Sequence, residues 1–364
     1  MAKKKQPVTV FSDPMVPLSE VHLPGWSVQS MLVPLSEVHL PPDWSIQSVL
    51  TPLSETIDWS HVFLGLTPEW YTADCSGVKV GVLDTGCVLH PDLKLADRFD
   101  FTGSRIGPDD QVRHGSWCCG FIGATANDIG VRGIAAGVKL YSLKVLGDNG
   151  SGTDRTIAAG LRKAIDLKLD IISMSFGGRG MSQECHELLR AFTKGGGFAF
   201  AAAGNDGRDG RGIPLPENDP AAWAEVMGIA AVDMDGRLTE FSCYDTGTTC
   251  AGPGYQMLST VPNGYGLMSG TSMACPCVAG IAAKILAKHR NSGGDTPINS
   301  YLDMQDHIQK TATVKNDLKI INPMALFNEM KITPPPHNPG GVLSRIRFNV
   351  KTVDGETILI GLVE

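Results

Sequence analysis

The chain has 364 residues, of which 42% are apolar and 19% charged, and its 31 basic and 38 acidic side chains give a formal net charge of −7. This mildly acidic balance provides no electrostatic surface for nucleic acid, and no apolar run reaches the about 18 residues that a membrane helix requires. The 42 glycines are well above the usual share of ~7% and follow no three-residue period, which excludes collagen and predicts many tight loops around a packed sheet.

The N-terminus and the cysteines indicate a compartment. Ser12, Asp13 and Pro14 follow the lysine-rich start before a hydrophobic segment can form, so we expect no signal peptide and a cytoplasmic protein, with non-classical secretion left open. The nine cysteines are an odd set, and several of them lie within apolar helical pattern, as buried thiols in a reducing compartment do. A Cys243–Cys250 disulfide remains an alternative, and zinc binding is a weaker one because the paired C-x-x-C spacing is missing.

Residues 16–54 contain an internal repeat, since Val16–Pro24 returns unchanged as Val33–Pro41 and Thr51 begins a third copy. A period of 17–18 residues rich in proline matches no common solenoid and cannot bury a core alone. Residues 1–58 are therefore interpreted as a proline-containing segment, either a passive extended tail or a regulatory segment that lies across the main domain.

From Val78 onward, short apolar runs alternate with helical patterns, which predicts a parallel sheet covered by helices on both faces. The expected strands are Val78–Leu83, Lys139–Val145, Asp170–Ser175, Phe198–Ala203 and Glu225–Val232. The expected helices are His114–Ala124, Thr153–Leu167, Ser182–Lys194 and Ser272–Arg290.

The alternating pattern ends near Lys331. Pro334–Pro336 is typical of a linker, and the runs Val342–Val350 and Glu356–Val363 flank Asp354-Gly355 as the strands of a terminal hairpin would. We therefore treat 331–364 as a linker with a hairpin-like tail.

Four polar residues stand at strand ends or helix starts, where sites in α/β folds are built. Asp84 follows a strand, His114 and Ser272 each open a helix, and Asn205 follows the buried strand Phe198–Ala203. Each alone is commonly a cap or loop residue. Together they supply a nucleophile, a base, a group that orients the base and a donor for an oxyanion, which is the equipment for acyl transfer.

The short motifs around these residues resemble those of the subtilisin-like serine proteases (subtilases), and their order Asp…His…Ser is that family's order. The motifs are Asp84-Thr-Gly, His114-Gly-Ser, Ala203-Gly-Asn205 and Gly270-Thr-Ser-Met-Ala274. The resemblance runs from 59 to 330 and implies a subtilisin-like three-layer α/β fold with a mostly parallel central sheet. The α/β-hydrolase alternative fails, because G-x-S-x-G is absent at the serine and the triad order differs.

The resemblance implies a role for each group. Ser272 is expected to attack the scissile carbonyl, His114 to take and return its proton, and Asp84 to orient and stabilise the imidazole. Asn205 and the backbone N–H of Ser272 are expected to bind the oxyanion. The expected cleft walls are Ser175, Phe176, Gly177, Gly178, Ala203 and Gly204 on one side and Gly150, Gly152 and Asp154 on the other.

The resemblance also implies a structural calcium ion. The loop 125–131 has the length of the family's calcium loop, and hard oxygen ligands suit this ion. The expected ligands are the carboxylate of Asp92, the amide of Asn127 and the carbonyls of Thr125, Ile129 and Val131. The family's N-terminal Gln ligand has no clear counterpart, and a loop of this shape without the ion is the alternative.

Two departures from the family concern the surroundings of the site. Trp117 stands where a second histidine is usual, and Cys277 replaces a usual histidine after Pro276. Cys118 resembles the free cysteine that some subtilases hold beneath the catalytic histidine, where thiol sensitivity or simple packing is expected.

The resemblance implies an endopeptidase that acts on protein or peptide substrates, with neither nucleic acid nor membrane as partner. A maturation protease for one partner peptide, or for its own N-terminal segment, is the alternative. A non-catalytic binding module is disfavoured by the four intact site residues. An extended N-terminal segment with prolines beside apolar residues is expected to occupy the cleft and restrain activity, as the short pro-segments of intracellular relatives do.

Overall fold

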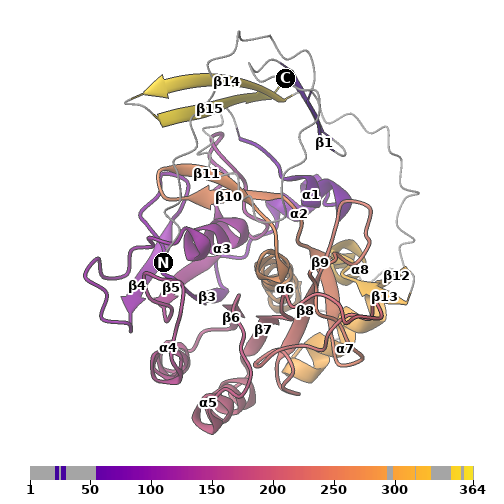
Figure 1. Cartoon of the computed structure of the whole chain (residues 1–364). Helices are drawn as coiled ribbons and strands as arrows, with labels where there is room; N and C mark the ends of the chain where they lie inside the picture. Colours follow the sequence, from indigo (N-terminus) through magenta and orange to yellow (C-terminus); the bar gives the residue numbers. More distant parts are fainter. Residues whose placement is uncertain are drawn as a thin grey trace.

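The computed structural model describes residues 21–23, 26–29, 55–292, 298–315, 317–328, 346–353 and 356–363. A nine-stranded sheet lies at the centre of the molecule, with helices on both of its faces (Figure 1). In spatial order its strands are β12 (Thr313–Lys315), β13 (Leu318–Ile320), β9 (Cys250–Pro253), β8 (Met227–Val232), β7 (Phe198–Ala202), β6 (Ile171–Met174), β3 (Lys79–Asp84), β5 (Lys139–Lys144) and β4 (Leu95–Asp100). All neighbours are parallel except β12 and β13, so the predicted three-layer α/β fold is confirmed.

The two faces of the sheet are both apolar because successive side chains of a strand point in opposite directions. In β7, Phe198 and Phe200 belong to one buried cluster, whereas Ala199 and Ala201 belong to another. This is why the central strands read as continuous apolar runs rather than as an alternating pattern.

Each face is covered by two of the four predicted helices. The first pair is α3 (His114–Gly123) and α6 (Thr271–Ser292), and the second pair is α4 (Asp154–Asp166) and α5 (Gln183–Lys194). All four begin within one residue of the predicted start. The Thr153 side chain caps α4 and the Ser182 side chain caps α5 by accepting backbone N–H groups, which is the local reason for these starts. The remaining helices are α1 (Trp59–Phe63), α2 (Pro68–Thr72), α7 (Tyr301–Thr311) and α8 (Pro323–Asn328).

Helix α6 runs through the interior. Its length and apolar composition would allow it to cross a membrane, but 89% of its apolar window is buried within the fold, as in the core helix of a soluble protein. Pro276 lies inside this helix and offers no N–H to the carbonyl oxygen of Ser272, which instead accepts the hydroxyl of Ser175 and the thiol of Cys118.

The strand order places a crevice at the carboxyl ends of the central strands. After β3 the chain adds β5 on one side of it, and then β6 on the other. Connections leave in opposite directions at such a point, which opens a space above the sheet where ligands of α/β proteins bind. Asp84 is the last residue of β3, so it lies at this point.

Two smaller sheets complete the described structure. The hairpin of β10 (Met257–Val261) and β11 (Gly264–Met268) packs against α3. The other sheet has the order β1-β2-β14-β15, with β1 (Val21–Leu23), β2 (Trp26–Gln29), β14 (Ile346–Val353) and β15 (Glu356–Val363). β14 and β15 pair from Ile346↔Val363 to Val353↔Glu356, and β14 runs parallel to β2.

The rest of the N-terminal repeat and the predicted linker at Pro334–Pro336 lie outside the described residues. Among the described residues, Glu55 already contacts the main domain, although it lies four residues before the predicted boundary. Glu55 donates its N–H to Asp128 and forms an ion pair with Arg132, and Thr56 donates its N–H to Gly130.

Candidate active site

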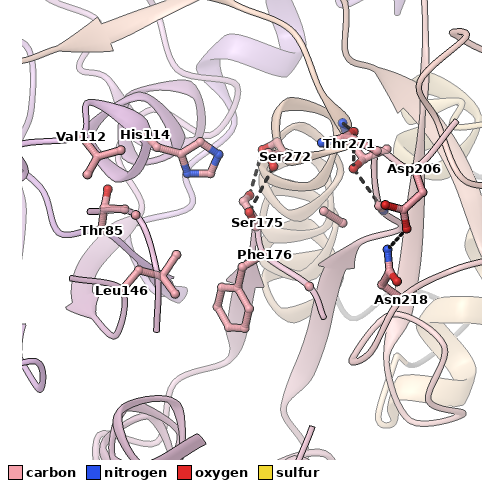
Figure 2. A pocket seen from close by; sticks show the side chains of 15 residues that line it. Thr85, Val112, His114, Leu146, Ser175, Phe176, Asp206, Asn218, Thr271 and Ser272 are labelled. Carbon is pink, nitrogen blue, oxygen red and sulfur yellow. Dashed lines mark hydrogen bonds between the residues drawn. The ribbon is translucent and has the colours of Figure 1, made fainter. Parts of the chain in front are cut away.

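A pocket of about 390 Å³ opens at the carboxyl ends of β3, β5, β6 and β7 (Figure 2). It brings together three of the four residues predicted to carry the chemistry, His114, Asn205 and Ser272, and the fourth, Asp84, lies directly behind His114. Its lining residues are Thr85, Val112, His114, Leu146, Gly150, Ser175, Phe176, Gly177, Ala202, Gly204, Asn205, Asp206, Asn218, Thr271 and Ser272.

Asp84 holds the imidazole of His114. The buried carboxylate oxygen Oδ1 lies 2.8 Å from His114 Nδ1 and also accepts the N–H of Thr85 at 2.7 Å. Burial lowers the pKa of His114, but the charge and hydrogen bond of Asp84, with a further contribution from Asp110, outweigh this and raise the net pKa above its ordinary value. The carboxylate therefore both orients the ring and stabilises its protonated form.

The backbone at the start of α3 packs directly against the backbone of residues 85–86, the turn that follows Asp84. A Cβ atom on Gly115 would lie 2.1 Å from the carbonyl oxygen of Gly86, so only glycine allows this approach. The Gly115 N–H donates to the hydroxyl of Thr85 at 2.9 Å, which ties the helix to the end of β3.

Two supporting groups were missed by the sequence reasoning. The buried Asp110 carboxylate accepts the hydroxyl of Thr85 and the backbone N–H groups of Val112, Arg113 and Ser116, so it organises the loop that leads into His114. The fully buried Lys144 donates to the carbonyl oxygens of Thr85 and Asp109 and forms an ion pair with Asp148 at 3.0 Å. The available signal was a lysine near the carboxyl end of the expected strand Lys139–Val145, the end at which sites in α/β folds are built.

Ser272 lies on the first turn of α6, across the pocket from His114, whose ring points toward it (Figure 2). In this structure the Ser272 hydroxyl donates to the carbonyl oxygen of Ser175 at 3.1 Å, and the Ser175 hydroxyl donates to the carbonyl oxygen of Ser272 at 2.8 Å. A hydrogen bond from Ser272 to His114 is therefore replaced here by a pair of bonds to the end of β6.

Asn205 presents its amide N–H groups to the pocket. Its Oδ1 accepts both the N–H and the hydroxyl of Thr271, at 2.9 and 3.0 Å. Because the carbonyl side of the amide is fixed by these two donors, the nitrogen side is the one left to bind an anionic oxygen.

The predicted cleft residues divide into two groups. Ser175, Phe176, Gly177, Gly204 and Gly150 line the pocket. The other four do not: Gly178 pairs with Asp219, Ala203 is buried, Gly152 pairs with Leu146, and Asp154 begins α4 and accepts the N–H of Ser182. Sequence reasoning did not assign five lining residues to the cleft: Val112, Leu146, Asp206 and Asn218, which come from loops without a periodic pattern, and Thr271, which begins α6.

The cysteines are all free and buried, so the Cys243–Cys250 disulfide considered above is not formed. Cys118 Sγ lies within 4.8 Å of the ligating atoms of Asp84 and His114, and its thiol donates to the carbonyl oxygen of Ser272 at 3.7 Å. Burial raises the pKa of Cys118 well above its ordinary value, so the group beneath the histidine is a neutral thiol.

The loop 125–131 has the donor set that a calcium ion requires. The carbonyl oxygens of Thr125, Ile129 and Val131 accept no hydrogen bond among the described residues, whereas the buried Asp92 carboxylate accepts the N–H of Val131 at 2.8 Å. Asp92 has no cationic partner in the described part of the chain, and burial raises its pKa. Free carbonyls around an uncompensated carboxylate fit a hard divalent cation.

The model of the subtilase family matches residues 75–327, which include all four predicted catalytic residues. The chain belongs to the subtilase family. The matched region begins just before β3 and ends in α8, so it covers the central sheet of this subtilase and the pocket above it.

Relatives agree with this assignment. The subtilase is 38% identical over 239 residues to alkaline elastase YaB of Bacillus sp. (strain YaB), an alignment that covers 65% of this chain and 60% of the relative. It is 36% identical to subtilisin Savinase of Lederbergia lenta, covering 65% of this chain and 84% of that one. It is 38% identical over 236 residues to the major intracellular serine protease of Bacillus subtilis (strain 168), covering 62% and 74%. The chain thus spans about three-fifths of the length of the first of these relatives.

Proposed function

We propose that this subtilase is a serine endopeptidase. The observation that carries the proposal is one arrangement: the His114 imidazole, held by Asp84 at 2.8 Å, faces Ser272 across a pocket into which Asn205 directs its amide. These are the positions of base, nucleophile and oxyanion donor in peptide-bond hydrolysis.

In the reaction Ser272 Oγ attacks the scissile carbonyl carbon while His114 Nε2 takes its proton. The serine side chain must first leave Ser175 and turn toward His114, which costs one ordinary hydrogen bond. The carbonyl oxygen becomes negatively charged and is bound by the Asn205 amide and the Ser272 backbone N–H. His114 then returns the proton to the leaving amine, and a water molecule repeats the sequence on the acyl-enzyme.

The test is covalent labelling and hydrolysis. A fluorophosphonate probe should label Ser272, and Ser272→Ala, His114→Ala and Asp84→Ala should each remove most peptide hydrolysis while the melting temperature stays within a few degrees. Because the three groups act as a unit, a double variant should be little worse than a single one. Unlabelled Ser272, or losses that multiply in the double variants, would contradict the proposal.

A pH profile tests the pairing of His114 with Asp84. The base must be neutral to accept a proton, and the carboxylate raises its pKa. Therefore kcat/KM should rise with pH through a midpoint above 6.5, the ordinary value for histidine. Asp84→Asn should shift the midpoint of the residual activity downward, and an unshifted midpoint would show that the carboxylate does not act on the imidazole.

We also propose that Asp92, Asn127 and the carbonyls of Thr125, Ile129 and Val131 hold a structural calcium ion. The ion would neutralise the buried carboxylate and fix the loop against the chain at Glu55 and Thr56, which lies beside it. It would supply no chemistry to the pocket.

We propose a reducing, cytoplasmic setting, which the nine free thiols support.

The N-terminal segment is proposed to restrain activity until it is removed, as the repeat suggested. Its described end does not enter the pocket: Glu55 and Thr56 lie along the loop 125–131, and Asp58 accepts the N–H of Leu258. Any inhibitory contact must therefore come from residues before Glu55. Deletion of residues 1–50 should raise activity on small peptides with little change in melting temperature, and an unchanged rate would show a passive tail.

A further inference from the structure

The pocket has two ends of different chemistry on either side of Ser272 (Figure 2). Beside His114, the side chains of Val112 and Leu146 make one end apolar. At the other end the side chains of Asp206 and Asn218 lie together, and Asn218 Nδ2 donates to Asp206 Oδ2 at 2.7 Å. Apart from His114, Asp206 is the charged residue among those that line the pocket.

The carboxylate of Asp206 is not neutralised within the described part of the chain. The neighbouring cations are engaged elsewhere, because Arg208 pairs with Glu240 and Arg211 pairs with Asp209. The contacts that Asp206 does make, from Asn218 and at 3.9 Å from the Cys243 thiol, both go to Oδ2. Its other oxygen is therefore left to accept from a ligand.

The walls leading to Asp206 are fixed and narrow. The Asn218 N–H donates to the carbonyl oxygen of Ala203, and the Gly178 N–H donates to the carbonyl oxygen of Asp219, so the 218–219 segment is tied to the ends of β6 and β7. A Cβ atom on Gly204 would lie 2.3 Å from Asn218 Nδ2, which shows how closely the amide is packed. Asp219 does not compete for a ligand, because its carboxylate accepts the N–H groups of Gly180 and Met181.

We propose that Asp206 makes this end of the pocket a subsite for a lysine or arginine side chain on the acyl side of the scissile bond. The inference rests on the proposed endopeptidase function and names its substrate class. The aliphatic stem would lie between the Ser175–Gly177 wall and the Ala202–Gly204 wall, and the cation would reach the free oxygen of Asp206. The apolar end at Val112 and Leu146 takes uncharged side chains on the neighbouring positions of the same peptide.

The experiment compares two peptide p-nitroanilides that differ only in the residue before the scissile bond, lysine in one and norleucine in the other. These share the aliphatic stem and differ in the ammonium group. Wild-type protein should give a kcat/KM at least about fivefold higher for lysine, the effect of a partly exposed ion pair. Asp206→Asn, which keeps the shape and the acceptor for Asn218, should bring this ratio close to one, and 0.5 M salt should reduce it in the wild type.

Asp166→Asn is the matched control, because it makes the same change at an exposed carboxylate outside the pocket and should leave the ratio unchanged. Fluorophosphonate labelling of Ser272 in each variant confirms that the site is assembled. A labelled wild type with a lysine-to-norleucine ratio of one or less, or a ratio unaffected by Asp206→Asn, would overturn the inference while leaving the protease function intact. Absence of both labelling and hydrolysis would overturn the proposed function, and this inference with it.

Discussion

Replacement of Lys144 by methionine tests whether a buried ammonium group holds the Asp84 turn in place. The Lys144 side chain is fully buried, and Nζ donates to the carbonyl oxygens of Thr85 and Asp109. Methionine keeps most of the volume but leaves both oxygens without a donor. Each hydrogen bond from a charged donor is worth about 1.5–3 kcal/mol, whereas the ion pair with Asp148, which is 34% exposed, adds at most about 1 kcal/mol.

The wild type also pays a free-energy cost for removing the Lys144 ammonium group from water, and methionine does not, so part of the lost hydrogen-bond energy is offset. We therefore expect Lys144→Met to lower the free energy of unfolding by about 3 kcal/mol, which is about 1 M in the urea midpoint at unchanged slope. Both proteins should carry Ser272→Ala, so that unfolded chains are not digested during the titration. Lys310→Met, at an exposed ion pair with Asp306, is the control and should change stability by less than about 0.5 kcal/mol. A midpoint for Lys144→Met that matches this control would refute the reasoning, because it would mean that the buried hydrogen bonds only balance the desolvation of the ammonium.

Three further outcomes are expected. Gly115→Ala should lower the free energy of unfolding by about 1–3 kcal/mol and should also lower kcat/KM, because the new Cβ would meet the Gly86 carbonyl oxygen. Gly77→Ala is the control and should change neither quantity, because a Cβ there meets nothing within 4 Å. Equal melting curves and rates for the two variants would contradict this prediction. Burial, with the charge of Asp245, raises the pKa of Glu217 from 4.5 to about 8, so the folded state retains a proton that the unfolded state loses, and the associated stability is present below pH 4.5 and lost as pH rises toward 8. Glu217→Gln should accordingly raise the urea midpoint relative to wild type at pH 9 but not at pH 4.5, and an equal effect at both would exclude this titration. Millimolar calcium added after chelation should raise the melting temperature of the wild type by mass action, and Asp92→Asn but not the exposed Asp166→Asn should remove the response; a wild type indifferent to calcium would exclude the ion.

The sheet and its four main helices were predictable because their signals are local. Buried parallel strands are continuous apolar runs, and Thr153 and Ser182 mark the starts of α4 and α5. The residues proposed for catalysis were predictable for a related reason. Asp84 ends a strand and His114 and Ser272 stand at helix starts, which are positions that a parallel sheet brings to one edge.

The remainder of the site depends on contacts between distant parts of the chain, which no local sequence pattern predicts. Asp206 and Asn218 meet only because the segment before Pro220 is bonded back to Ala203, and Lys144 reads as the polar end of a strand until its carbonyl partners are known. The hydroxyl of Ser272 donates to Ser175 rather than to His114, a choice set by the packing of α6 against β6. The expected cleft residue Asp154 is instead engaged with Ser182 at the start of α4.

Because all nine thiols are buried, their reaction with a reagent in solution reports local unfolding of the protein. A bulky water-soluble disulfide reagent cannot reach sulfur in the native fold, so its rate of reaction measures how often a region detaches. The cysteines lie in different regions, so that the rate of thiol modification can be measured for each region separately. Cys185 lies on α5 at one face of the sheet, Cys118 and Cys119 lie on α3 at the other, and Cys250 lies on β9. Mass spectrometry of briefly exposed protein would therefore rank the helices and strands by the ease with which they separate from the sheet, without the introduction of any probe.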